Sequence, residues 1–94
     1  MSERTAAALA TLDLLLPKLK AVPIGPAREQ LLDEAEALRR AVAAFHMEAI
    51  RFRMFSVDRL LKQAGDPDDT RALVERLRLD LETGGFHTRS HTAP

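Results

Sequence analysis

The chain has no cysteine, tryptophan or tyrosine, and its 94 residues include only four phenylalanines. Without cysteine there is no disulfide, no thiolate ligand for zinc and no thiol nucleophile. The few aromatic rings argue against a protein that binds single-stranded nucleic acid, because such proteins stack bases on exposed rings. The lack of cysteine also fits a reducing compartment, so we expect a cytoplasmic protein.

An excess of charge of one sign is also missing. The 14 Lys and Arg residues balance the 14 Asp and Glu residues, so no net charge attracts the chain to nucleic acid or to a membrane surface. No apolar run reaches the roughly 18 residues of a membrane-spanning helix. The apolar stretch near the N-terminus is interrupted by Asp13 and Pro17, which does not fit a secretory signal. We expect a soluble protein that does not enter the membrane.

Motifs of the common catalytic and cofactor sites are absent too. The sequence contains no phosphate-binding P-loop, no GxGxxG, no HExxH and no repeated Glu-x-x-His of the di-iron bundles. His87 and His91 are four residues apart but have no carboxylate near them, so we interpret them as part of a flexible tail. We therefore expect a protein that is not an enzyme and holds no cofactor and no metal.

Helix-forming residues are what the chain has in quantity. Ala, Leu, Arg and Glu dominate, and β-branched residues are few and scattered, which predicts an all-α fold. Turn-forming residues divide the chain into three helices, at about 3–20, 26–64 and 67–83. They form a single domain, 1–85, followed by a flexible tail, 86–94.

Proline, glycine and aspartate set these expected boundaries. Pro17 should kink the first helix or stop it early near Leu16, because proline lacks the N–H that a helix needs. Gly65 should end the second helix. Asp66 should cap the third helix, with Pro67 in its first helical position.

The expected central helix, 26–64, is much longer than its neighbours. It contains neither Gly nor Pro between Ala27 and Ala64, and would be about 55–60 Å long. Its apolar residues follow two lines that lie more than a quarter turn apart. One short helix cannot cover both lines, so we expect an antiparallel helical bundle completed by homodimerisation. A break near Ser56, which would give a four-helix monomer, is the alternative.

The two apolar lines define the residues expected in the core and the dimer interface. All of these residues are apolar and recur at helical spacing along the expected central helix. They are Leu31, Leu38, Val42, Phe45, Ala49, Ile50, Phe52, Met54, Val57 and Leu61.

A row of polar residues runs between the two apolar lines. Arg39, His46 and Arg53 are spaced by seven, so on one helix they would share a face. In one interpretation the row is a solvated edge, where the arginine methylenes cover apolar surface and the charges stay in water. In the other, the dimer encloses the row as a polar pocket that takes an anion or a carboxylate such as Glu36 or Glu48.

These patterns predict a small helical interaction or regulatory protein that acts as a homodimer. The sequence does not identify a further protein partner. One alternative is a nucleic-acid-binding regulator that contacts phosphates through Arg51, Arg59 and Lys62, in the basic part of the central helix. Another is a ligand- or metal-binding bundle centred on His46, an imidazole that suits both tasks.

Overall fold

The computed structural model describes residues 3–22 and 25–86, and this part of the chain contains four helices and no strand. Their bounds are Glu3–Lys20 for α1, Pro26–Ala43 for α2, Met47–Gln63 for α3 and Asp68–Thr83 for α4. The predicted all-α class is confirmed, but the predicted number of three helices is wrong. Among these helices there is none that is both long and apolar enough to cross a membrane.

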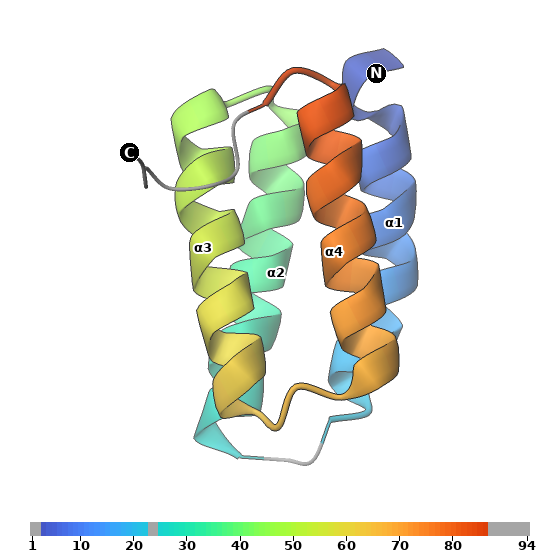
Figure 1. Ribbon diagram of the computed structural model, residues 1–94. Helices are drawn as coiled ribbons and strands as arrows, with labels where there is room; N and C mark the ends of the chain where they lie inside the picture. The colour runs from blue at the N-terminus through green and yellow to red at the C-terminus, as the bar shows by residue number, and fades with distance from the viewer. Residues whose placement is uncertain (1–2, 23–24, 87–94) are drawn as a thin grey trace, which may run out of the picture.

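The helices run up and down in turn, each antiparallel to the next (Figure 1). α2 packs against α1 and α3, and α1 also packs against α4; of the helix pairs that are in contact, α3 and α4 contact each other least. The side chains between the four helices form one continuous apolar core. Its fully buried members larger than alanine are Leu12, Leu15, Leu19, Leu31, Leu38, Val42, Ile50, Met54, Val57, Leu61, Val74, Leu77 and Leu81.

The predicted long central helix is interrupted by a tight turn between α2 and α3. The N–H of Phe45 donates to the carbonyl of Val42 at 3.0 Å, and the N–H of His46 donates to that of Ala41 at 2.9 Å. These two bonds form a Schellman motif, which ends a helix and reverses the chain. Phe45 adopts a φ of 59°, in the left-handed region that usually holds glycine.

The alternative of a break that gives four helices is correct in the number of helices, but its position near Ser56 is wrong, because Ser56 is buried inside α3. The spacing of the buried residues explains the real position of the break. In α2 they follow a regular spacing that ends at Val42, and in α3 a similar spacing begins at Ile50. Ile50 comes eight positions after Val42, where an interval of seven positions would continue the pattern. The extra residue rotates the second stripe by about 100°, so only a chain that folds back can bury both stripes in one core.

Proline does not stop α1, which passes through Pro17 and ends at Lys20. Pro17 is exposed on the outer side of the helix, while Leu15 and Leu19 on either side of it are fully buried. Packing of this apolar stripe against α2 and α4 therefore outweighs the local cost of the missing N–H.

The turn between α3 and α4 follows the prediction only in part. Gly65 ends α3 with a φ of 102°, as expected for a glycine that closes a helix. Asp66 does not cap α4. The helix has Pro67 at its N-cap, and the carboxylate of Asp66 accepts a hydrogen bond from Nε of Arg71 at 2.8 Å.

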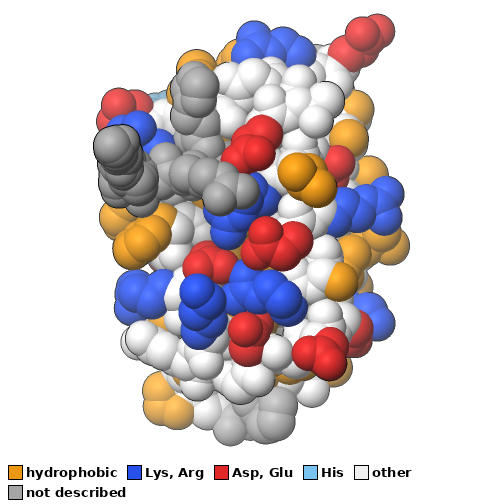
Figure 2. Space-filling model, viewed as in Figure 1, with side chains coloured by type: hydrophobic (Ala, Val, Ile, Leu, Met, Phe, Trp, Pro, Cys, Tyr) orange, Lys and Arg blue, Asp and Glu red, His pale blue; other side chains and the backbone are white. Residues whose placement is uncertain are grey.

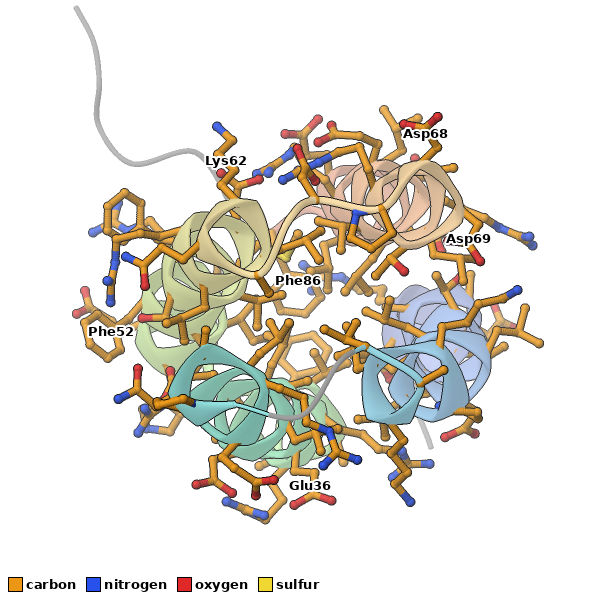
Figure 3. The ribbon with its side chains drawn as sticks, turned by 90° about the horizontal axis from the view of Figure 1, so that it is seen from below. Glu36, Phe52, Lys62, Asp68, Asp69 and Phe86 are labelled. Atoms are coloured by element: carbon orange, nitrogen blue, oxygen red, sulfur yellow. The ribbon has the colours of Figure 1, made fainter. Side chains whose placement is uncertain are left out.

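Phe86 belongs to the core and not to a flexible tail. The side chain is 2% exposed and lies between the helices, near the centre of the bundle in Figure 3. The ring of Phe45 packs edge-on against it, with 4.9 Å between the ring centroids, and the guanidinium of Arg4 lies over both rings. These contacts hold the ring of Phe45 in place at its strained backbone position. Residues 87–94, including His87 and His91, lie outside the described part of the chain.

Candidate functional site

The outer face of α3 carries an exposed pair of aromatic rings. Phe52 and Phe55 are 59% and 51% exposed, and because they are three residues apart they are neighbours on the helix surface. Phe52 points away from the bundle in Figure 3. The guanidinium of Arg53 lies over the ring of Phe52, 5.2 Å from its centroid. This exposed apolar ring thus has a cation over one of its faces.

Cations surround the two rings. Arg51, Arg59 and Lys62, the residues predicted to contact phosphates, are all exposed and lie on the same side of α3 as the rings. Nζ of Lys62 is 3.5 Å from a carboxylate oxygen of Asp58. We call Glu48, Arg51, Phe52, Phe55, Arg59 and Lys62 the α3 outer face. The sequence predicted its cations, but not that Phe52 and Phe55 lie together in water.

Most residues predicted for the dimer interface are instead buried within one chain. Leu31, Leu38, Val42, Ile50, Met54, Val57 and Leu61 are fully buried among the four helices. Ala49 is half-buried against the core, while Phe45 and Phe52 are exposed. The core assignment is therefore correct for the first seven. Their burial does not require a second chain, because the turn at Phe45 lets one chain cover both apolar lines.

The predicted polar row of Arg39, His46 and Arg53 does not form, because the helix that would align it is broken. Arg39 of α2 makes an ion pair with Asp13 of α1, with a shortest N–O distance of 2.9 Å. The hydrogen bond from Arg39 is the largest cause of a lowered pKa at Asp13. Arg53 binds Glu34 of α2 through Nη1, at 2.8 and 3.0 Å from the two carboxylate oxygens.

His46 has a structural role at the start of α3. It is the N-cap residue, and its Nδ1 accepts a hydrogen bond from the backbone N–H of Ala49 at 3.4 Å. Glu48 lies in the first turn, where a negative charge favours the positive end of the helix dipole. The histidine within an apolar stretch is thus explained by a helix boundary. The sequence signal for that boundary was the shift between the two apolar lines.

A cluster of ion pairs joins α3 to α4, where the two helices pack least (Figure 2). Arg71 of α4 donates to Asp58 of α3, to Asp66 in the turn and to Glu75 on its own helix. Arg78 adds a second contact to Asp58 at 3.4 Å. The cluster adds contacts between charged side chains to the apolar core that the two helices share.

The pKa of Asp58 reflects this cluster. Partial burial alone would raise it, but the hydrogen bond from Arg71 and the charges of Arg71, Lys62 and Arg78 lower it below the usual value for an aspartate. Asp58 is therefore ionised at neutral pH and bridges the two helices as a carboxylate.

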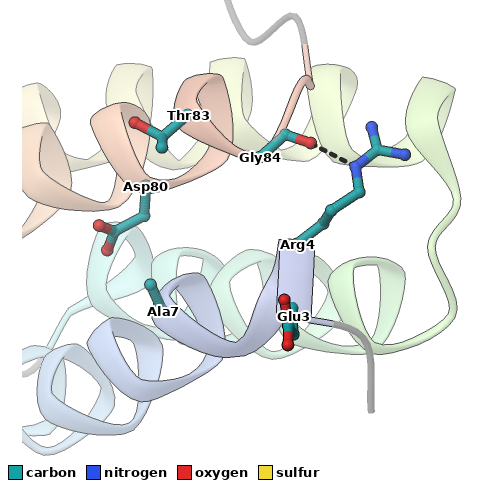
Figure 4. A pocket seen from close by; sticks show the side chains of 6 residues that line it. All are labelled: Glu3, Arg4, Ala7, Asp80, Thr83 and Gly84. Atoms are coloured by element: carbon teal, nitrogen blue, oxygen red, sulfur yellow. Dashed lines mark hydrogen bonds between the residues drawn. The ribbon is translucent and has the colours of Figure 1, made fainter.

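A small pocket lies between the first turn of α1 and the last turns of α4 (Figure 4). Its volume is about 300 Å³, and its lining residues are Glu3, Arg4, Ala7, Asp80, Thr83 and Gly84. Nε of Arg4 donates to the carbonyl of Gly84 at 2.6 Å, and Asp80 accepts a hydrogen bond from Thr11. Because these polar groups already have partners within the chain, the pocket is part of the α1–α4 contact.

The part of the chain that the structure describes has no cluster of side chains that could bind a metal ion. In residues 3–22 and 25–86 there is no group of three or more His, Asp and Glu side chains that could hold a metal ion. His46, around which the sequence allowed a ligand or metal site, is occupied in capping α3.

No family model, no curated protein and no solved structure matches this chain. The α3 outer face presents two exposed rings among exposed cations on one helix.

Proposed function

We propose that this protein is a small non-enzymatic interaction protein of the cytoplasm that acts as a homodimer, and that it self-associates through the α3 outer face. The observation that carries the proposal is the exposure of Phe52 and Phe55 next to each other on one helix. Full burial of a phenylalanine side chain contributes about 1.5–3 kcal/mol, so covering both rings favours association.

Other exposed apolar side chains support the choice of this face. Leu14 and Leu79 are 54% and 61% exposed, but α1 and α4 carry one each, and isolated apolar residues are normal on a protein surface. Phe45 already packs against Phe86. Met47, the first residue of α3, is 45% exposed, but on the described surface only Phe52 and Phe55 are large exposed apolar side chains about one turn apart on the same helix.

The expected dimer is weak. Two single helices packed together bury a small surface area, below the roughly 1,200 Å² that is typical of stable complexes. A dissociation constant in the micromolar range or weaker is therefore expected. Such a dimer forms and separates readily, which suits a regulatory protein whose exposed rings another protein can also bind.

The double variant Phe52→Ser/Phe55→Ser is expected to abolish self-association without changing the fold, because both side chains lie outside the core. The measurement is sedimentation velocity over a wide range of protein concentration, with circular dichroism to verify folding. The matched control is Leu14→Ser/Leu79→Ser, which removes two exposed apolar side chains elsewhere. A wild-type protein that remains monomeric at the highest concentration, or a control that loses association equally, would contradict the proposal.

Nucleic-acid binding is the second candidate, and one observation favours it. Arg51, Arg59 and Lys62 are all exposed on the α3 outer face, where phosphates could approach them together. Arg51→Glu/Arg59→Glu is expected to abolish binding to a fluorescent DNA duplex if this function is correct. In the wild type the logarithm of the affinity should fall with the logarithm of salt concentration, by about 0.9 per phosphate contact.

The control for this measurement is Lys20→Glu/Arg76→Glu, which reverses two exposed charges on α1 and α4. The control should bind DNA much as the wild type does if the contact is local to α3. Equal losses in the two double variants would show non-specific attraction and exclude the α3 outer face as a nucleic-acid site.

A further inference from the structure

Four side chains of the α3 outer face lie along one line of the helix. Glu48, Phe52, Phe55 and Arg59 follow one another at intervals of four, three and four residues. At about 100° per residue they fall within an arc of about 60°. The line has an acidic residue at one end, two rings in the middle and a basic residue at the other end.

The spacing of this line is symmetric about the midpoint between Phe52 and Phe55. A twofold axis through that midpoint turns the helix end for end, so each position meets the one at equal distance on the other side. Phe52 then faces Phe55 of a second copy, and Glu48 faces Arg59 of the second copy. The same pattern is therefore complementary to itself when two α3 helices pack antiparallel.

The two charged ends of the line are available for such pairing. Glu48 and Arg59 are both exposed, and neither forms an ion pair with another residue in the part of the chain that the structure describes. Arg53, in contrast, is already held by Glu34. Pairing Glu48 with Arg59 would therefore leave the existing ion pairs intact.

We infer that two copies of this chain pair through antiparallel α3 helices, with the aromatic rings at the centre and a Glu48–Arg59 ion pair at each end. This inference rests on the proposed homodimer and specifies its orientation and register. It fixes which charges meet across the interface, and that can be tested by reversing them.

Arg51 and Lys62 of the α3 outer face should behave differently from Arg59 in this dimer. Arg51 and Lys62 lie to one side of the line, and the twofold axis brings the Arg51 and Lys62 residues of both copies to the same edge of the interface. These like charges repel each other. Arg51→Glu is therefore expected to leave association unchanged or to strengthen it, whereas Arg59→Glu is expected to weaken it.

The decisive experiment compares Glu48→Arg, Arg59→Glu and an equimolar mixture of the two. Each single variant places like charges at both ends of the interface, and its self-association is expected to weaken about tenfold or more. In the mixture, one copy of each variant restores opposite charges at both ends, so a heterodimer as tight as the wild-type dimer is expected. Sedimentation of the separate and mixed proteins, one of them fluorescently labelled, measures these affinities.

Three results would overturn the inference, and they separate it from the proposed homodimer. If the mixture associates no better than the single variants while Phe52→Ser/Phe55→Ser still abolishes the dimer, the face is right and the register is wrong. If Arg51→Glu weakens association as much as Arg59→Glu, the orientation is wrong. A wild-type protein that never associates overturns both proposals. Circular dichroism of each variant verifies that α3 remains folded.

Discussion

Deletion of Phe45 is expected to convert the protein into a dimer built on one continuous central helix. The buried stripes of α2 and α3 are out of phase by one residue, and the deletion brings Val42 and Ile50 to the seven-residue spacing of a single stripe. The deletion also removes the residue with positive φ that closes the turn. The hairpin of α1 and α2 would then pack against α3 and α4 of a second chain, and the apolar core would be rebuilt between chains.

The distance between the ends of the central helix measures this change. The native sequence has no cysteine, so spin labels can be attached specifically at Gln30→Cys and Lys62→Cys, both exposed positions. These positions lie at the same end of the bundle in the wild type (Figure 1). On a continuous helix they would be separated by about 45 Å. The labelled chain is mixed with excess unlabelled chain, so that only distances within one chain are recorded.

Two controls separate this dimer from association through the α3 outer face. Phe45→Gly keeps the number of residues in the turn and suits its positive φ, so it should retain the short distance of the wild type. The deletion is also made in the Phe52→Ser/Phe55→Ser background, which removes the exposed rings. A deletion variant that remains a monomer with a short label distance would show that the phase of the stripes does not determine the turn.

Asp58→Asn is expected to lower the free energy of unfolding by about 2 kcal/mol at pH 7. The side chain of Asp58 is 23% exposed and bridges α3 to Arg71 and Arg78 of α4. Asparagine keeps its size but loses the charge that compensates the two guanidinium groups. The effect should fall below the 3–5 kcal/mol typical of a fully buried pair, because Arg71 retains Asp66 and Glu75.

The effect of Asp58→Asn should depend on pH in a defined direction. The pKa of Asp58 is lower in the folded protein than the value of about 3.9 in an unfolded chain. Its stabilisation is therefore fully present above the unfolded pKa and is lost as pH falls through the folded pKa. Urea unfolding should give a constant difference between variant and wild type from about pH 5 to 8, shrinking at lower pH.

The control for this measurement is Asp33→Asn. Asp33 is exposed on α2 and makes no ion pair with another residue in the described ranges 3–22 and 25–86. Its substitution should change stability by less than about 0.5 kcal/mol across the pH range. If Asp33→Asn and Asp58→Asn gave the same pH profile, the cluster around Arg71 would have no particular role in stability.

The helical class and most of the core could be predicted from apolar spacing alone. The spacing of Leu31, Leu38 and Val42 is that of a helix and not of a strand, and all three residues are buried in the core. The turn at Phe45 could not be predicted from residue type, because phenylalanine has no preference for positive φ. Its only sequence signal was the phase shift between two stripes, which we interpreted as a need for a second chain.

Ion pairs between different helices could not be predicted from the sequence either. The partners of Arg39 and Arg53 are Asp13 and Glu34, which lie on neighbouring helices 26 and 19 residues away. Helical spacing predicts contacts within a helix, such as Arg71–Glu75, but which helices become neighbours depends on where the chain turns. Because the turn at Phe45 was not predicted, Arg39, His46 and Arg53 were wrongly placed in one row on a single helix. The cations of the α3 outer face were unaffected because they share one helix.

The pairing of α1 with α4 has a consequence for folding kinetics. α2 and α3 are joined by a turn of three residues, whereas the contact between Arg4 and Gly84 spans 80 residues of chain. The entropy lost in closing a loop grows with its length, so we expect the α2–α3 hairpin to form early and the α1–α4 contact to form late. Substitutions in the late contact, such as at Thr11 or Asp80, therefore mainly change how fast the folded protein opens. Substitutions between α2 and α3 mainly change how fast it folds.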